Sequence, residues 1–147
     1  MNAWDKTFLN LCDEIATRSK DPSTKVGACI VDKKRRIVSM VYNGFPRGCD
    51  DTPELYADRN IKLMRTIHAE VNAIITAGRD LEGCTLYVSP LHPCSNCAAI
   101  IVQSGIKRVV YSSPKDETAD AYTRWIENFT SAQYLFEEAG VDVDCIP

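Results

Sequence analysis

Four side chains in the middle of the sequence could together carry out metal-assisted chemistry. The chain contains His68-Ala69-Glu70 and, further on, Pro93-Cys94-Ser95-Asn96-Cys97. One imidazole and two thiolates fill three corners of a tetrahedral zinc site and leave the fourth for water, as in catalytic zinc sites. We therefore predict His68, Cys94 and Cys97 as metal ligands. Glu70 is not needed as a ligand, so we predict it as the catalytic proton carrier.

The expected reaction follows from what such a site does to water. Zinc lowers the pKa of bound water from ~15.7 to ~7, which makes hydroxide available at neutral pH. A neighbouring carboxylate can take a proton, pass it to a ring nitrogen and later protonate a departing amino group. The spacing H-x-E followed by P-C-x-x-C is the signature of zinc-dependent nucleobase and nucleotide deaminases. The sequence therefore predicts hydrolytic loss of ammonia.

Two other interpretations of these residues stay open. A Cys-x-x-Cys pair can be half of a structural zinc site, but such a site needs four protein ligands and the chain has only His68 and His92 to add. A thioredoxin-like redox pair would account for Pro93, yet it leaves His68 and Glu70 without a role. We expect His92 to line a pocket or a loop, because the three-ligand set is complete without it.

Alternating helix and strand patterns predict the scaffold that positions these residues. Apolar spacing favours helices over 4–19 and 69–77, after Cys94 to about 103, and over a long C-terminal segment. It favours strands over 26–31, 37–42, 85–88, 108–111 and 141–143. The apolar face of the last helix comprises Tyr122, Trp125, Ile126, Phe129, Ala132 and Phe136. We predict an α/β fold, a three-layer α/β/α sandwich with a mixed sheet of about five strands. Two helix N-termini would then converge on the metal and favour thiolates.

Composition limits the domain number, the compartment and the partners. A chain of 147 residues with 45% hydrophobic and 25% charged residues predicts a single domain, residues 1–147. We expect it to be neither secreted nor membrane-inserted, because it has no signal-like start and no run of ~18 apolar residues. Seven cysteines, an odd number, favour reduced thiols and a cytoplasmic location. A net charge of −3 disfavours nucleic acid as a partner and leaves a small nucleotide.

Further segments resemble the deoxycytidylate (dCMP) deaminases of the cytidine and deoxycytidylate deaminase family over about residues 8–111. They are Arg18-Ser19-Lys20-Asp21-Pro22, Val26-Gly27-Ala28-Cys29-Ile30-Val31, Tyr42-Asn43-Gly44-Phe45-Pro46, Gly48-Cys49-Asp50-Asp51, the helix after His68 and Gln103-Ser104-Gly105-Ile106-Lys107. The resemblance implies a cytidine-deaminase-like fold, conversion of dCMP to dUMP and ammonia for thymidylate synthesis, and a homo-oligomer, with a hexamer favoured. A deaminase of dCTP or of 5-modified dCMP stays open, and a tRNA or nucleic-acid deaminase is less favoured.

The resemblance also suggests residues around the substrate. Asn43 would hold sugar and phosphate, and the Ala69 backbone would contact the cytosine carbonyl. Hydroxyl and cationic groups before the first strand, Ser23 and Lys20 among them, could meet a 5′-phosphate. Lys115 could meet the phosphate instead, and Tyr111 could line the pocket. A regulatory dCTP with Mg²⁺ is expected near the residues that match regulated relatives, namely Tyr42, Gly44, Cys49, Asp50, Asp51 and Arg79.

Some parts of the chain depart from the family pattern. Residues 52–67 replace a longer segment that often covers the substrate, and the roles of Tyr56, Arg59 and Arg65 within it stay open. A second, structural zinc in some relatives uses two Cys and two His, whereas here Cys49 remains without the two His. We therefore expect one zinc per chain. Residues 116–139 also depart, so they leave regulation and oligomer contacts open.

Overall fold

Five strands form one mixed sheet in the part of the chain that the structure describes. The structure is a computed structural model and describes residues 2–112 and 120–147, with side chains for 2–112 and 126–147. The strand order is β2-β1-β3-β4-β5. The strands are β1 (Gly27–Val31), β2 (Ile37–Tyr42), β3 (Thr85–Ser89), β4 (Arg108–Ser112) and β5 (Asp142–Ile146). β1 pairs antiparallel with β2 and β3, whereas β3–β4 and β4–β5 are parallel, which confirms the predicted mixed sheet.

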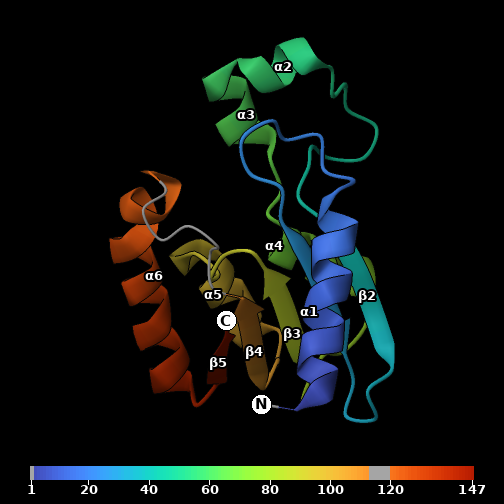
Figure 1. The fold of residues 1–147 in the computed structure, drawn as a ribbon, viewed down its shortest axis with the longest axis vertical. Coiled ribbons are helices and arrows are strands. Elements are labelled where there is room, and N and C mark those ends of the chain that lie inside the picture. Colours follow the sequence, from blue (N-terminus) through green and yellow to red (C-terminus); the bar gives the residue numbers. More distant parts are fainter. Residues whose placement is uncertain (1, 113–119) are drawn as a thin grey trace.

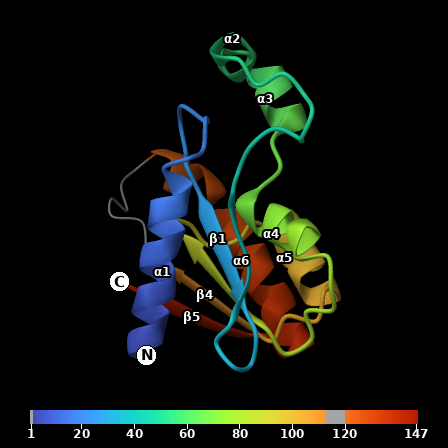
Figure 2. The same cartoon turned by 90° about the vertical axis from the view of Figure 1, so that its right-hand side faces the viewer.

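Helices cover both faces of this sheet. α1 (Ala3–Ala16) lies on one face, and α4 (Ala69–Ala77), α5 (Ser95–Gln103) and α6 (Asp120–Ala139) lie on the other (Figures 1 and 2). Successive residues of β1 alternate between the two layers: Cys29 and Val31 join the α1 core, whereas Ala28 and Ile30 join the core beneath the other helices. The three-layer α/β/α sandwich is therefore confirmed, and every residue of β1 is buried.

The start of α1 is fixed by capping and by a buried carboxylate. Asn2 caps the helix and forms a reciprocal capping box with Asp5. Asp5 is fully buried, accepts a 2.8 Å hydrogen bond from the Tyr87 hydroxyl and forms a bidentate ion pair with Arg108. These contacts join α1 to β3 and β4. The helix ends at Ala16 rather than near residue 19, and Thr17 closes it with a hydrogen bond to the Glu14 carbonyl.

Two helix N-termini face the same end of the sheet and carry the predicted metal ligands. His68 is the N-cap of α4, and that helix ends at Gly78, whose φ of 59° gives the left-handed conformation that glycine adopts easily. β3 ends at Ser89, and a short loop leads to Cys94, the N-cap of α5. Cys97 then lies in the first turn of α5. Ligand sites beyond strand ends are typical of α/β sheets.

Residues 52–67 form two short helices that the sequence analysis did not assign. α2 (Pro53–Ala57) and α3 (Arg59–Arg65) lie beyond the sandwich, past the N-terminus of α4 (Figures 1 and 2). Asp58 caps α3 through the Ile61 N–H, and Tyr56 stacks on Phe45 with ring centroids 4.0 Å apart. The strand for which we expected 141–143 runs instead over Asp142–Ile146. Among the described helices, none is long and apolar enough to cross a membrane.

Candidate active site

The three predicted metal ligands meet in one cluster. His68 Nδ1 lies 3.1 Å from Cys97 Sγ and 3.5 Å from Cys94 Sγ, and the two sulfurs are 3.3 Å apart. Tetrahedral zinc with Zn–S of about 2.3 Å and Zn–N of about 2.0 Å separates its ligand atoms by roughly 3.5 to 3.8 Å. The donor set and its spacing therefore fit zinc with small outward shifts. Within the described chain, this is the group of His, Cys and acidic residues that could hold a metal.

The environment of the ligands favours a metal-binding charge state. The hydrogen bond between Cys94 and Cys97 lowers the pKa of Cys94 to about 4, with a further contribution from His68. The same hydrogen bond raises the pKa of Cys97. The hydrogen bond to Cys94 raises the pKa of His68. A bound dication would replace the shared proton and take both sulfurs as thiolates.

Glu70 is a buried carboxyl group in the first turn of α4, next to this cluster. It is 5% exposed, and burial raises its pKa above the ordinary value, although the nearby His68 opposes the shift. Glu70 is absent from the group of possible metal ligands. It lines the same pocket as His68 and Cys94. A carboxylate of raised basicity beside a metal site can accept and return protons.

A pocket of about 360 Å³ opens onto the cluster, a size suited to a small organic ligand. Its walls come from the loop before β1, the end of β2, α3, the starts of α4 and α5, and α6. The lining residues include the predicted Asn43, Ala69, Glu70, His68, Cys94 and Ser23. Sequence reasoning missed Asp21, Lys62, Thr66 and Leu91 as pocket residues. Only the grouping of polar residues before the first strand gave a signal for Asp21.

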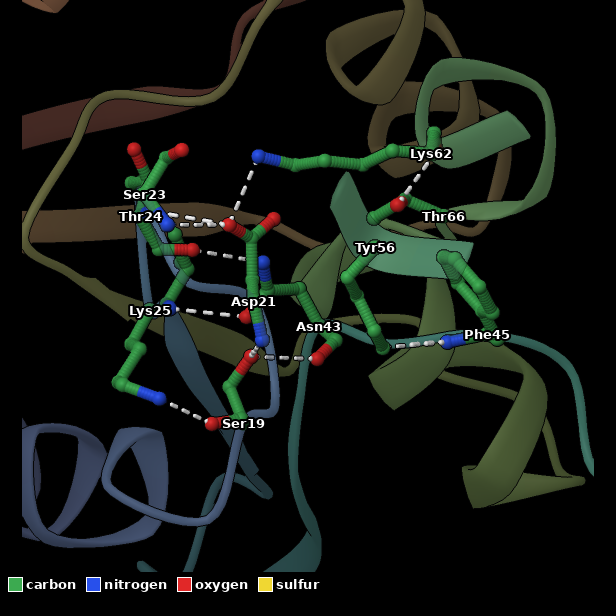
Figure 3. A network of polar contacts seen from close by, with 11 residues as sticks. Ser19, Asp21, Ser23, Thr24, Lys25, Asn43, Phe45, Tyr56, Lys62 and Thr66 are labelled. Carbon is green, nitrogen blue, oxygen red and sulfur yellow. Dashed lines mark hydrogen bonds and ion pairs between the residues drawn. The ribbon is translucent and has the colours of Figure 1, made fainter. Parts of the chain in front are cut away.

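Asn43 is held rigidly with part of its amide left for a ligand. It is 6% exposed; its Oδ1 accepts from the Val26 N–H at 3.0 Å, and its Nδ2 donates to the Thr24 carbonyl at 3.0 Å. Its own carbonyl accepts from the Ser19 hydroxyl at 2.9 Å (Figure 3). Among the described contacts, one Nδ2 hydrogen is thereby used and the other can face the pocket. The position suits a contact to a sugar hydroxyl.

The other residues predicted to contact the substrate lie in different places. Ser23 lines the pocket, whereas Lys20 forms an exposed 2.9 Å ion pair with Asp51 and is not a lining residue. Tyr111 lies behind the pocket wall, its ring 4.8 Å edge-on from His92. Lys115 lies outside the described residues. Ser23 therefore lies at the site, whereas Lys20 and Tyr111 are not among the residues that line it.

His92 is part of the pocket wall and not of the metal group. Its Nδ1 is 2.7 Å from the Pro93 carbonyl and its Nε2 is 3.3 Å from the Gln133 side-chain oxygen. The ring also contacts Phe129, at a centroid distance of 5.6 Å. Burial lowers the pKa of His92, which favours a neutral ring at neutral pH. His92 thus connects α6 to the start of α5.

The residues expected near a regulatory nucleotide lie along one surface segment, with one exception. Tyr42, Gly44, Cys49, Asp50 and Asp51 follow one another from the end of β2 toward α2. The Tyr42 carbonyl accepts from Asn72 Nδ2, near the start of α4. Arg79 follows the other end of α4, which is about 13 Å long at 1.5 Å per residue. The structure therefore does not place Arg79 with the other five.

Comparison with known proteins agrees with this geometry. The model of the cytidine and deoxycytidylate deaminase zinc-binding region matches residues 2–113. An uncharacterized deaminase from the luxG 3′ region of Aliivibrio fischeri is 43% identical over 147 residues, covering 100% of this chain and 96% of the relative. The Homo sapiens deoxycytidylate deaminase is 40% identical over 146 residues, covering 94% of this chain and 76% of the relative.

A solved structure shares the fold. The dCMP deaminase of cyanophage S-TIM5, in complex with dCMP and dUMP, superposes with a TM-score of 0.73 at 22% identity and covers 99% of both chains. With a family model that spans most of the sequence and relatives of such identity and coverage, the chain belongs to the cytidine and deoxycytidylate deaminase family.

Proposed function

We propose that this protein is a zinc-dependent dCMP deaminase that hydrolyses dCMP to dUMP and ammonia. The observation that carries the proposal is the His68, Cys94 and Cys97 cluster with the buried Glu70 beside it in one pocket. The named relatives support the substrate, because the human relative is a deoxycytidylate deaminase. The product dUMP would supply thymidylate synthesis.

The side chains divide the chemistry between them. His68, Cys94 and Cys97 would hold the zinc, which when bound supplies hydroxide at neutral pH. Glu70 takes a proton from the attacking water and delivers it to the ring nitrogen beside the attacked carbon. The water oxygen bonds to that carbon. Glu70 then takes the remaining proton from the new hydroxyl group and passes it to the amino group, so that the carbon–nitrogen bond breaks, ammonia leaves and the hydroxyl oxygen becomes the carbonyl of dUMP. The Ala69 backbone orients the cytosine carbonyl, and Asn43 orients the sugar.

A substrate panel tests this function and its alternatives. Zinc-loaded protein would be assayed for ammonia release with dCMP, dCTP, 5-methyl-dCMP, cytidine and a tRNA. We expect the highest kcat/KM with dCMP. Preference for dCTP or 5-methyl-dCMP would replace the substrate and keep the reaction, whereas activity on tRNA alone would overturn the nucleotide-enzyme proposal. An inactive protein with one zinc bound, with and without added dCTP, would contradict the function itself.

Regulation by dCTP or dTTP, with Mg²⁺, remains part of the proposal. Its support is the family resemblance of the segment that contains Tyr42, Gly44 and Asp50. Asp51 already pairs with Lys20, so an arriving cation or nucleotide would compete with that exposed ion pair. Titrating dCTP and dTTP into the dCMP assay, with and without Mg²⁺, measures whether the segment responds.

We also propose a cytoplasmic homo-oligomer built from one domain per chain, with a hexamer favoured. All seven cysteines are free of disulfides, which suits a reducing compartment. β2 is an edge strand of the sheet, and its Ile37 and Met40 are exposed. Leu63 and Met64 of α3 are also exposed, so apolar surface is available for contacts between copies of the chain. Light scattering after size-exclusion chromatography would give the number of chains.

A further inference from the structure

The pocket contains a cationic side chain that the sequence analysis did not single out. Lys62, on α3, places its ammonium nitrogen 2.9 Å from an Asp21 carboxylate oxygen, and only 20% of the Lys62 side chain is exposed. Both residues line the pocket that contains His68 and Glu70. We propose that Lys62 binds the 5′-phosphate of the substrate and thereby selects nucleotides over nucleosides. This inference rests on the function proposed above and identifies the residue that binds the 5′-phosphate.

Asp21 fixes the position of Lys62. Its Oδ1 accepts hydrogen bonds from the Ser23 N–H at 2.8 Å and the Thr24 N–H at 3.1 Å, and the same oxygen pairs with Lys62 (Figure 3). Three donors therefore offset the charge of one 96%-buried residue, which limits its repulsion of an incoming anion. An ammonium group has three N–H donors. With one directed at Asp21, the others remain for a phosphate oxygen.

The surroundings of Lys62 suit a phosphate. Figure 3 shows the Lys62 ammonium and Ser23 on the same side of Asp21. Ser23 and Thr24 bring hydroxyl donors to the pocket wall, and Arg59, one turn earlier on α3, brings a second cation. Charge-assisted hydrogen bonds from such groups are among the stronger polar contacts available to a phosphate.

The order of the pocket residues matches the order of groups in a nucleotide. Glu70 and the metal ligands form the end where the base must react. The Asn43 amide donates a hydrogen bond to the Thr24 carbonyl, and the Thr24 N–H donates one to the Asp21 carboxylate. Two hydrogen bonds therefore connect Asn43, the proposed sugar contact, with Asp21, the partner of Lys62. A base at Glu70 and a sugar at Asn43 would direct the 5′-phosphate toward Lys62.

A purely structural role for Lys62 predicts a different result. If the ion pair with Asp21 only held α3 over the pocket, its loss would weaken turnover of every substrate to the same extent. If Lys62 binds phosphate, its loss weakens dCMP and leaves deoxycytidine, which has no phosphate, unaffected. The ratio of kcat/KM for these two substrates therefore separates the roles.

The experiment compares wild type with Lys62→Met, Lys62→Arg and Arg65→Met. Arg65 is the matched control, because it is a cation on the same helix that does not line the pocket. We expect Lys62→Met to lower kcat/KM for dCMP about 10- to 100-fold, mainly through KM, as for a lost hydrogen bond to a charged group. Lys62→Arg should recover part of this loss. Arg65→Met should match wild type, and deoxycytidine kinetics should be the same in all four proteins.

Folding is checked by zinc content and thermal unfolding, and Lys62→Gln, which keeps an uncharged polar group at this position, replaces the Met variant if that variant unfolds. An equal loss for dCMP and deoxycytidine, or unchanged dCMP kinetics, would overturn the phosphate role while leaving the deaminase function intact. A wild-type protein without activity on dCMP would instead overturn the proposed function, before any variant is compared.

Discussion

At the scale of single residues, the proposed chemistry needs three metal ligands and a separate carboxylate that transfers protons. The ligand atoms of His68, Cys94 and Cys97 lie within 4.8 Å of one another. Glu70 is buried beside them and is not part of that group. This grouping could be predicted from the sequence, because it depends on residue type and on short spacing within two motifs. The position of Lys62 in the pocket could not be predicted, because its partner Asp21 is distant in sequence and only the fold brings the two residues together.

Replacing Glu70 by Gln should separate catalysis from metal binding. The variant keeps the size of the side chain but cannot accept a proton, so we expect kcat for dCMP to fall at least ~10²- to 10⁴-fold, the usual contribution of general acid–base catalysis. Zinc content, measured by elemental analysis, should stay near one per chain. Loss of the zinc together with activity would mean that Glu70 is a ligand.

At the scale of helices and strands, local signals specified most of the fold. α4 was predicted with its observed bounds, because an apolar pattern ends at a glycine that the helix end requires. α5 was expected after Cys94 through about Gln103, and it runs over Ser95–Gln103. By contrast, α2 and α3 are too short for a clear period, and they are positioned by long-range contacts such as Tyr56 with Phe45 and Lys62 with Asp21.

The contact between α1 and the sheet gives a test of stability against pH. Arg108 lowers the pKa of the buried Asp5 to about 2 from the ordinary 3.8. Because the folded pKa is the lower one, the stabilisation is present above the unfolded value, near pH 4, and is lost as the pH falls toward about 2. We expect Asp5→Asn to lower the free energy of unfolding by about 3 kcal/mol at pH 7, as for a broken buried ion pair.

Urea denaturation of wild type and Asp5→Asn at several pH values measures this effect. The difference between the two proteins should shrink between pH 4 and about pH 2. Asp144→Asn is the matched control, because Asp144 pairs with the same Arg108 but its side chain is 50% exposed. Its loss should cost less than about 1 kcal/mol. A constant difference across the pH range would show that the Asp5 charge does not carry the stabilisation.

At the scale of the whole molecule, the candidate metal site brings together residues that are far apart in sequence. The ligands lie at the starts of α4 and α5, on the face of the sheet opposite α1 (Figure 2). α3 and α6 also contribute residues to the pocket wall, so elements from several parts of the fold line one ligand site. Binding of metal should therefore stabilise the fold as well as supply chemistry.

Removal of zinc by a chelator should abolish dCMP deamination and lower the unfolding midpoint by roughly 10 °C, from about 4 kcal/mol of lost binding energy. Differential scanning calorimetry of the metal-free and zinc-restored protein measures the shift. Restored zinc should return both midpoint and activity, which controls for irreversible damage. An unchanged midpoint together with full activity in the metal-free protein would contradict the zinc assignment.

Hydrolytic deamination of dCMP in the pocket of Glu70 can be followed with isotope-labelled water. Zinc-loaded protein would be incubated with dCMP in 18O-labelled water, and the products measured by mass spectrometry and ammonia assay. We expect dUMP that carries a single 18O at the new carbonyl and an equal amount of ammonia, with formation of both products slowed ~10²- to 10⁴-fold in Glu70→Gln. Unchanged dCMP, or the same turnover from Glu70→Gln, would contradict this mechanism.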